Sequence, residues 1–215
     1  YEAISRLKSA LKMFQKEGSK ENVTKCLTDL GLHYYYTGNI RQAEHQLEKL
    51  FDEKEAGSVV SFEIIGLLIL FSAILGKIDK ADDYADFAQG ILRGLDEQMR
   101  AIGDAWINLS YSYRFYVSGN FLTSQKMNLK LIEQFKRQNA EIVLPLAYFQ
   151  SSATCYYLRQ YHKGVEHAKA GIRITEKKGI YDSQTGWLNY AYALNAVGLG
   201  HIEKAMEYAE ESLRI

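Results

Sequence analysis

The chain has 215 residues, of which 47% are hydrophobic and 24% charged, a composition typical of soluble globular proteins of one or two domains. Its 26 acidic and 26 basic side chains leave no basic excess, so we expect no direct contact between this segment and nucleic acid. Two distant cysteines, Cys26 and Cys155, form neither a disulfide framework nor a CxxC zinc motif and indicate a reducing, cytoplasmic location. The most apolar run, residues 64–75, is shorter than the roughly 20 residues that span a bilayer, so we expect no membrane contact.

The single proline and the spacing of apolar residues predict an all-helical chain. Leu27, Leu30 and Tyr34, for example, lie three and four residues apart, which places them on one face of a helix. We expect about 11 antiparallel helices, a leading one followed by five pairs. In chain order these helices are predicted over residues 1–16, then 20–37 and 40–54, 58–75 and 78–94, 99–118 and 121–137, 142–158 and 161–177, and 182–199 and 202–214.

A phrase of the form Gly-x-(large apolar)-x-x-(small) recurs at the turn inside each pair. It begins with glycine in four copies and with Arg159 in a degenerate fifth: Gly38, Gly76, Gly119 and Gly200. The small residues recur at intervals of 40, 38, 43, 40 and 41 residues, at Ala3, Ala43, Ala81, Ser124, Gly164 and Ala205. This regularity predicts a tandem repeat with a period near 40 residues, which forms a single domain over residues 1–215.

Each part of the phrase has a mechanical role. The glycine suits the left-handed backbone position that ends a helix without a clash at Cβ. The small residue lets the second helix of the pair approach the first closely, and a further small residue is expected opposite it. Such residues stand seven positions before the phrase in four of the five pairs: Gly31, Ser112, Ser152 and Ala193.

The pattern Leu30-Gly31-x-x-Tyr34-x-x-x-Gly38-x-Ile40-x-x-Ala43 resembles the tetratricopeptide (TPR) consensus, and its glycine and alanine skeleton extends over nearly the entire chain. The resemblance implies a right-handed α-α superhelix, that is, a TPR-like solenoid. The period near 40 exceeds the standard of about 34 residues. In this it resembles the helical-repeat sensor domain of MalT-like transcriptional regulators, which are ATP-dependent and end in a LuxR-type DNA-binding domain. Kinesin light chains and bacterial peptide-sensing regulators also use repeats near this length.

No motif for catalysis, cofactor binding or metal binding is recognisable in the sequence. It contains no phosphate-binding loop, no dinucleotide fingerprint and no HExxH. His162 and His167 lie five residues apart and so do not share a helix face, as two metal ligands on one helix would. Cys155 occupies the core position that Tyr34 has in the first pair, and we expect a buried, inert thiol. The chain is therefore predicted to be no enzyme and to need no cofactor or metal.

The first helices of the pairs usually line the concave surface of TPR arrays, so the resemblance implies a binding face there. The residues at the corresponding positions are rich in tyrosine and tryptophan: Tyr35, Tyr36, Trp106, Tyr113, Arg114, Tyr116, Phe149, Tyr156, Tyr157, Trp187 and Tyr190. Flat rings with a polar group suit stacking on sugars or gripping peptides. The alternative interpretation is that these aromatics pack between neighbouring repeats as core.

Two functions remain open on the sequence. The first is the sensor domain of a MalT-like regulator, in which a small-molecule inducer or regulatory protein binds the concave groove and shifts the parent protein between resting and active states. The second is a TPR scaffold that docks a peptide or partner protein. The chain begins without methionine and ends within a helical pattern, so we expect a fragment of a larger protein. Self-association through its ends is a third possibility.

Overall fold

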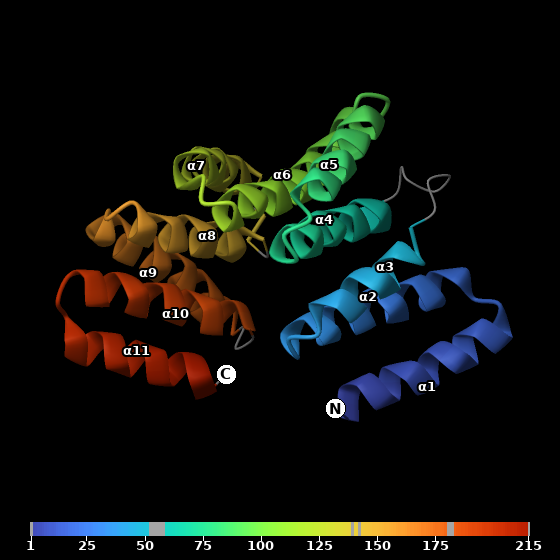
Figure 1. Ribbon diagram of the computed structural model, residues 1–215, viewed down its shortest axis with the longest axis horizontal. Helices are drawn as coiled ribbons and strands as arrows, with labels where there is room; N and C mark the ends of the chain where they lie inside the picture. The colour runs from blue at the N-terminus through green and yellow to red at the C-terminus, as the bar shows by residue number, and fades with distance from the viewer. Residues whose placement is uncertain (1, 52–58, 139, 142, 180–182, 215) are drawn as a thin grey trace. The chain divides into compact units, whose positions relative to one another are not determined.

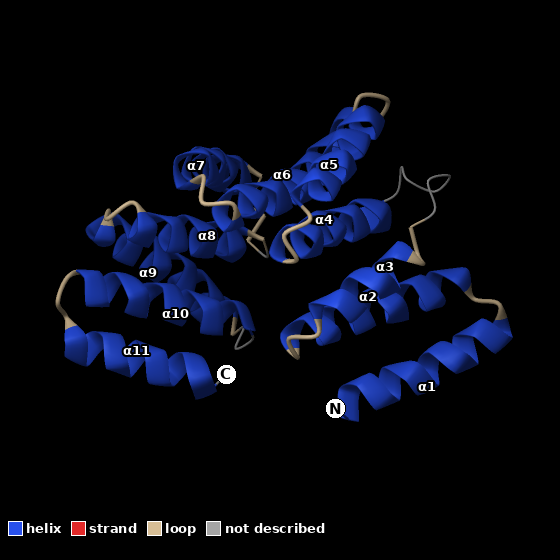
Figure 2. Cartoon of the chain, in the orientation of Figure 1, coloured by secondary structure: helices blue, strands red, loops and turns tan. Residues whose placement is uncertain are grey.

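The structure is a computed structural model that describes residues 2–51, 59–138, 140–141, 143–179 and 183–214. Within these ranges it contains eleven α-helices and no strand, which confirms the predicted all-α class (Figures 1 and 2). The helices are α1 (Glu2–Glu17), α2 (Lys20–Tyr36), α3 (Ile40–Glu48), α4 (Val59–Ile74), α5 (Ile78–Leu92), α6 (Glu97–Val117), α7 (Phe121–Arg137), α8 (Leu144–Tyr157), α9 (Tyr161–Lys178), α10 (Ser183–Gly198) and α11 (Ile202–Arg214).

The observed helix bounds agree with the predicted ones within two residues, except in α3. That helix was expected to reach residue 54 but ends at Glu48. The aromatic ring of Phe51 packs edge-on against Tyr84 and Phe87 of α5, with ring centroids 5.9 and 5.3 Å apart. The chain leaves the helix where this contact with the next pair begins. Residues 52–54 of the prediction lie outside the described residues.

The chain forms two compact units, residues 1–118 and 119–215. Unit 1 contains α1–α6 and unit 2 contains α7–α11 (Figure 1). In unit 1, one apolar cluster around Leu68 joins α2, α3 and α4, and a second around Phe62 and Ile65 joins α4, α5 and α6. In unit 2, Ala168 and Ala196 belong to a cluster that joins α9, α10 and α11. Each unit thus has its own core, and the single domain expected over residues 1–215 stays a prediction.

The glycines of the repeated phrase adopt the left-handed conformation that the sequence predicts. Their φ angles are 77°, 74°, 79° and 76°, in the order Gly38, Gly76, Gly119 and Gly200. Arg159 starts the degenerate copy, and it has a φ of 56°. It is the one non-glycine residue with positive φ among the described residues. The turn geometry is therefore common to all five pairs, even where glycine is missing.

In the pairs α2–α3, α4–α5, α8–α9 and α10–α11 the two helices pack on each other and the small residue of the phrase is buried, as predicted. Ala43, Ala81 and Ser124 are fully buried, whereas Ala3 in α1 is exposed. At the crossing of α8 and α9, Ser152 Oγ donates a hydrogen bond to the carbonyl oxygen of Gly164 at 2.7 Å. A Cβ atom on Gly164 would lie only 2.0 Å from Asn195 Oδ1 of α10. Glycine is required there because three helices meet at one point.

In the first four pairs, the residue after the small residue of the phrase contacts the first helix of the following pair. We call this residue the linking position: Glu44, Asp82, Gln125, Val165 and, in the last pair, Met206. The buried Glu44 carboxylate accepts a hydrogen bond of 2.9 Å from Ser72 Oγ of α4 and pairs with the Lys77 ammonium group. The Asp82 carboxylate forms a two-point ion pair with the Arg114 guanidinium group of α6.

The last three linking positions are uncharged. The Gln125 side-chain amide donates to Cys155 Sγ of α8 at 3.2 Å and to Gln160 Oε1 at 3.1 Å. Val165 packs against the cluster that contains Tyr192 of α10. In α11, Met206 is 60% exposed. The repeat thus uses one position, with different chemistry each time, to attach each pair to the next.

Candidate functional site

Five of the predicted binding residues come together on α8 and α10 in unit 2. We call Phe149, Tyr156, Tyr157, Trp187 and Tyr190 the aromatic surface. The two helices pack side by side. The rings of Phe149 and Trp187 meet across them with centroids 5.7 Å apart. Tyr156 and Tyr157 form an edge-on pair at 5.3 Å.

Two further aromatic side chains support this surface from the neighbouring helices. Phe121 at the start of α7 stacks on Tyr157 with centroids 4.5 Å apart and planes 6° from parallel. Tyr161 at the start of α9 contacts Tyr156 at 5.9 Å. Neither residue is among the predicted binding residues. The sequence does distinguish them, because the large apolar position of the phrase is aromatic only in these two copies and isoleucine in the others.

The aromatic surface remains accessible although its rings pack on each other. Tyr157 is 48% exposed and Tyr190 is 49% exposed. Burial of the remainder raises the pKa of the Tyr190 phenol, and the nearby phenols of Tyr157 and Tyr156 raise it further. Tyr190 therefore stays protonated at neutral pH and can donate a hydrogen bond to a ligand. The arrangement offers fixed flat rings together with hydroxyl groups.

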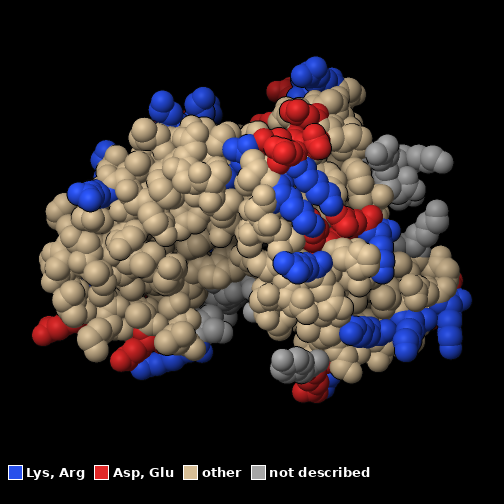
Figure 3. All heavy atoms as spheres, viewed as in Figure 1, with Lys and Arg blue, Asp and Glu red and all other residues tan. Residues whose placement is uncertain are grey.

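Neither α8 nor α10 contains an Asp, Glu, Lys, Arg or His residue. Figure 3 shows the same contrast on the viewed face of unit 2, where charged side chains gather at the edges and the area over α8 and α10 is largely uncharged. The neighbouring helices differ. α7 and α9 together carry Lys126, Lys130, Lys136, Arg137, Lys163, Lys169, Arg173, Lys177 and Lys178. α11, which packs on α10, carries the acidic side chains of Glu203, Glu207, Glu210 and Glu211. The aromatic surface is thus a neutral area beside charged helices.

The predicted residues of unit 1 take part in packing between helices. The Tyr35 ring of α2 stacks on the buried ring of Phe71 in α4, with centroids 5.3 Å apart. Trp106 packs against the cluster that joins α4, α5 and α6. Tyr113 and Tyr116 contact each other at 5.3 Å. The side chain of Tyr36 lies outside the described residues.

The side chain of Arg114 in α6 contacts α5 and neighbouring rings of its own helix. Besides its two-point ion pair with Asp82, its guanidinium group lies over the rings of Phe115 and Tyr111, at 4.9 and 5.8 Å. The pKa of the Tyr111 phenol is raised by burial and then by its hydrogen bond to Asp82. These contacts give Arg114 a structural role in unit 1, and its part in ligand binding stays a prediction.

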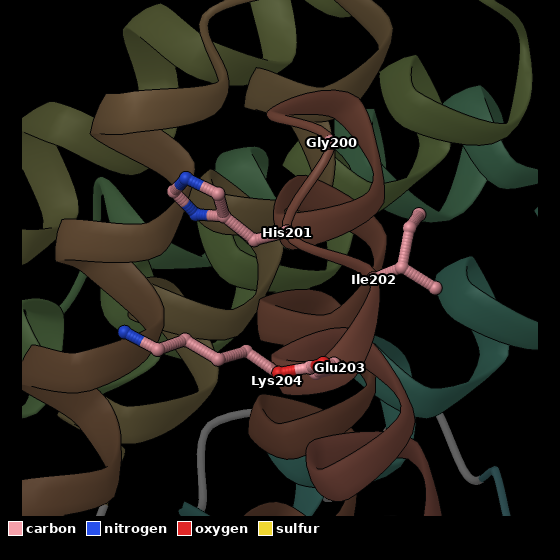
Figure 4. Close-up of a pocket in the computed structure, with 5 residues that line it drawn as sticks. All are labelled: Gly200, His201, Ile202, Glu203 and Lys204. Carbon is pink, nitrogen blue, oxygen red and sulfur yellow. The ribbon is translucent and has the colours of Figure 1, made fainter.

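A shallow pocket of about 410 Å³ lies at the turn between α10 and α11, lined by Gly200, His201, Ile202, Glu203 and Lys204. Figure 4 shows the side chains of His201 and Lys204 on one side of the ribbon and Ile202 on the other. Its walls come from one turn of the chain, so polar groups do not converge on its centre from several elements, as they do in specific ligand sites. The aromatic surface is the better candidate site.

The remaining chemistry-bearing residues are dispersed. No three His, Cys, Asp or Glu side chains among the described residues could hold a metal ion together. Cys155 is fully buried, as predicted, and burial raises the pKa of its thiol. None of the described helices is long and apolar enough to cross a membrane.

Comparison with known proteins identifies the fold. No protein-family model and no curated protein sequence matches the chain. Among solved structures, it is similar to BtubC (BKLC) from P. vanneervenii, with a TM-score of 0.64 and 14% identity, covering 99% of this chain and 89% of that one. MamA (AMB-1) aligns with a TM-score of 0.44 and 16% identity, covering 86% of this chain and 95% of that one. The protein therefore has the TPR-like helical-repeat fold that its sequence predicts.

Proposed function

We propose that this protein is a non-catalytic recognition module, which binds a peptide or partner protein on the aromatic surface of α8 and α10. The observation that carries the proposal is the pair of half-exposed tyrosines, Tyr157 and Tyr190, held on a packed layer of other rings. Such rings lose little conformational freedom when a ligand binds, because they are already ordered. Aromatic side chains of this kind commonly supply most of the binding free energy at protein interfaces.

A thermal-shift screen of peptides and sugars tests this function on the intact chain. A ligand that binds only the folded protein raises Tm, and the rise grows with the logarithm of its concentration relative to Kd. For each ligand found, the affinity is measured for the variants Tyr157→Ala and Trp187→Ala in unit 2 and for the variant Tyr113→Ala in unit 1. A matched control is Leu129→Ala, since Leu129 is exposed on α7 outside the aromatic surface.

We expect Tyr157→Ala and Trp187→Ala each to weaken binding at least about tenfold, equivalent to about 1.4 kcal/mol, and Leu129→Ala to leave it unchanged. A ligand whose affinity depends on Tyr113 but not on Tyr157 or Trp187 would place recognition in unit 1. That result would contradict the proposal.

The finer proposal, a sensor domain of a MalT-like transcriptional regulator, is supported by the resemblance of the repeat. In that case an inducer or regulatory protein on the aromatic surface stabilises one of two states of a longer regulator. The flanking sequence provides the test: a phosphate-binding ATPase before this segment and a helix-turn-helix after it are expected. A flanking sequence without them leaves the peptide-docking scaffold as the function.

A further inference from the structure

The neutrality of the aromatic surface restricts the chemistry of its ligand. α8 and α10 provide no side chain that can form an ion pair, whereas the neighbouring α7 and α9 are rich in basic side chains and α11 in acidic ones. A ligand recognised through charge of either sign would be held better on those charged helices than on the aromatic surface, because charged hydrogen bonds are the stronger ones. The aromatic surface therefore suits an uncharged ligand segment that offers apolar faces.

The spacing of two aromatic positions on α8 is close to the repeat of a particular backbone conformation. Phe149 and Tyr156 lie seven residues apart, which corresponds to a backbone rise of about 10.5 Å along the helix axis. A polyproline II helix repeats every three residues, or about 9.3 Å. Side chains that leave one helix face at this rise can lie beneath prolines that are one polyproline turn apart.

The hydroxyl groups of the surface suit the backbone of the same conformation. A polyproline II helix has no internal hydrogen bonds, so its carbonyl oxygens point outward and accept from donors nearby. Tyr157 and Tyr190 are both about half exposed, and their phenols are protonated at neutral pH and can donate. Proline has no backbone N–H group to donate. A proline-rich segment therefore does not require a carboxylate acceptor on the surface that binds it.

We propose that the aromatic surface of α8 and α10 binds an uncharged, proline-rich segment of a partner protein in the polyproline II conformation. This inference rests on the proposed function and specifies the ligand of that site. Proline-rich segments bind aromatic-lined surfaces at low entropic cost, because they are extended before they bind.

A neutral oligosaccharide is the competing ligand class, since sugar rings also stack on aromatic side chains. Its many hydroxyl groups are held best by carboxylates, which are the strongest acceptors. Neither α8 nor α10 carries a carboxylate, the side chain of Asn189 on α10 is buried, and the exposed phenols of Tyr157 and Tyr190 are only neutral acceptors. The surface therefore favours the peptide.

Tryptophan fluorescence provides the experiment, with decaproline as the probe. The chain has two tryptophans, and Trp106→Phe leaves Trp187 on the aromatic surface as the reporter. Titrations of this variant use decaproline, a Gly-Ser peptide of the same length, decaglutamate and maltotetraose. Isothermal titration calorimetry on the unsubstituted chain repeats the measurement, so that the result does not depend on the folding of the Trp106 variant.

We expect decaproline to change the Trp187 emission saturably, and its affinity to be the same within about twofold between about 0.05 and about 0.5 M NaCl, because no ion pair is screened. Tyr190→Phe should weaken binding about threefold and Tyr190→Ala about tenfold or more. Leu129→Ala on α7 is the control and should bind as the unsubstituted chain does.

The outcomes separate this inference from the proposed function. If decaproline does not bind, or binds equally to Tyr190→Ala, the inference is wrong. If decaproline fails while another peptide binds in a Tyr157-dependent manner, the recognition function stands without the polyproline ligand. Binding of maltotetraose alone, lost in Tyr190→Ala, would replace the peptide by a sugar and overturn the inference.

Discussion

Arg159 holds a backbone conformation that residues with a Cβ atom usually avoid. Its φ of 56° lies in the left-handed region, at the place where the other copies of the repeat carry glycine. For an L-residue this conformation costs about 1 kcal/mol or more. The turn between α8 and α9 therefore keeps the geometry of the other turns at the expense of local strain.

Replacing Arg159 with glycine should stabilise the protein. We expect Arg159→Gly to raise the free energy of unfolding by about 1 kcal/mol, because glycine adopts this φ without a clash. Urea denaturation measures the change. The matched reverse substitution is Gly119→Arg, where no atom would obstruct the new Cβ and only the backbone cost remains. It should destabilise by a similar amount, and an unchanged midpoint in both variants would contradict this account.

His167 should make the stability of unit 2 depend on pH. It packs against the Tyr148 ring at 5.8 Å, and burial lowers its pKa. Glu166 opposes this effect, while Lys136 and Lys163 add to it. The unfolded chain, with a histidine pKa near 6.5, then binds more protons than the folded one at mildly acidic pH. The contribution of His167 is complete above about pH 6.5 and is lost as the pH falls through its folded pKa.

The measurement compares urea midpoints at about pH 7.5 and about pH 5. The loss of stability on acidification should be smaller in His167→Gln, which has no group that titrates there. Equal losses in the two proteins would show that His167 does not cause the dependence.

The sequence predicts which residues share a helix face, but not which neighbour covers that face. Tyr35, Tyr157 and Tyr190 are all predicted to line the concave face, although they stand at three different positions of the repeat. The structure stacks Tyr35 on Phe71, whereas Tyr157 and Tyr190 stay half exposed. The difference arises from the following helix, whose distance and side chains the spacing alone does not determine.

At the scale of the helix, the linking positions explain how consecutive pairs are attached. Four of them contact the next pair, each through different chemistry. Glu44 pairs with a hydroxyl and a lysine, and Asp82 pairs with an arginine. Gln125 donates to a thiol, and Val165 makes an apolar contact. The repeated phrase does not reveal them, because the residue after the small residue looks like any other polar or apolar position. A linking position can be recognised only when the structure shows which residue of the next helix it contacts.

The contact between α5 and α6 can be tested with a double-mutant cycle. The Arg114 and Asp82 side chains are only 16% and 33% exposed, so their ion pair is less screened than a surface pair. We expect Asp82→Ala and Arg114→Ala to show a coupling energy of about 1–2 kcal/mol in urea denaturation. The exposed pair Arg6–Glu2 in α1 is the control and should show at most about 0.5 kcal/mol. Equal coupling energies in the two pairs would refute a special role for the first.

Helix positions were more predictable than helix contacts. The bounds of ten helices could be predicted because turn glycines and apolar periodicity are local properties of the chain. The early end of α3 could not, since it depends on the packing of Phe51 against Tyr84 and Phe87 more than thirty residues later.

At the scale of the whole molecule, the chain consists of two compact units with separate cores. The TPR-like fold was predictable because its phrase recurs every 40 residues or so. The division at residue 118 was not, because the phrase at Gly119 has the same form as the others. The division falls inside the predicted pair of α6 and α7, so the phrase specifies the turn there but does not reveal where one compact unit ends and the next begins.

Each unit should fold without the other. We expect a fragment of residues 119–215 to be helical by circular dichroism and to unfold cooperatively in urea, because its helices bury their apolar residues within the unit. A fragment of residues 144–215 is the comparison, since it lacks α7, which packs on α8. A 119–215 fragment that is no more cooperative than the shorter one would show that the units depend on each other.

The linking positions also limit how the repeat number can change in evolution. Loss of α4 and α5 would bring Glu44 to the helix that carries Arg114, so an acid would still meet a base. Loss of α6 and α7 would instead bring Asp82 to the buried thiol of Cys155 in place of the Arg114 guanidinium group, so its carboxylate would lose the two-point ion pair. The repeats are alike in outline but not interchangeable, and only some deletions or duplications of this chain leave a foldable descendant.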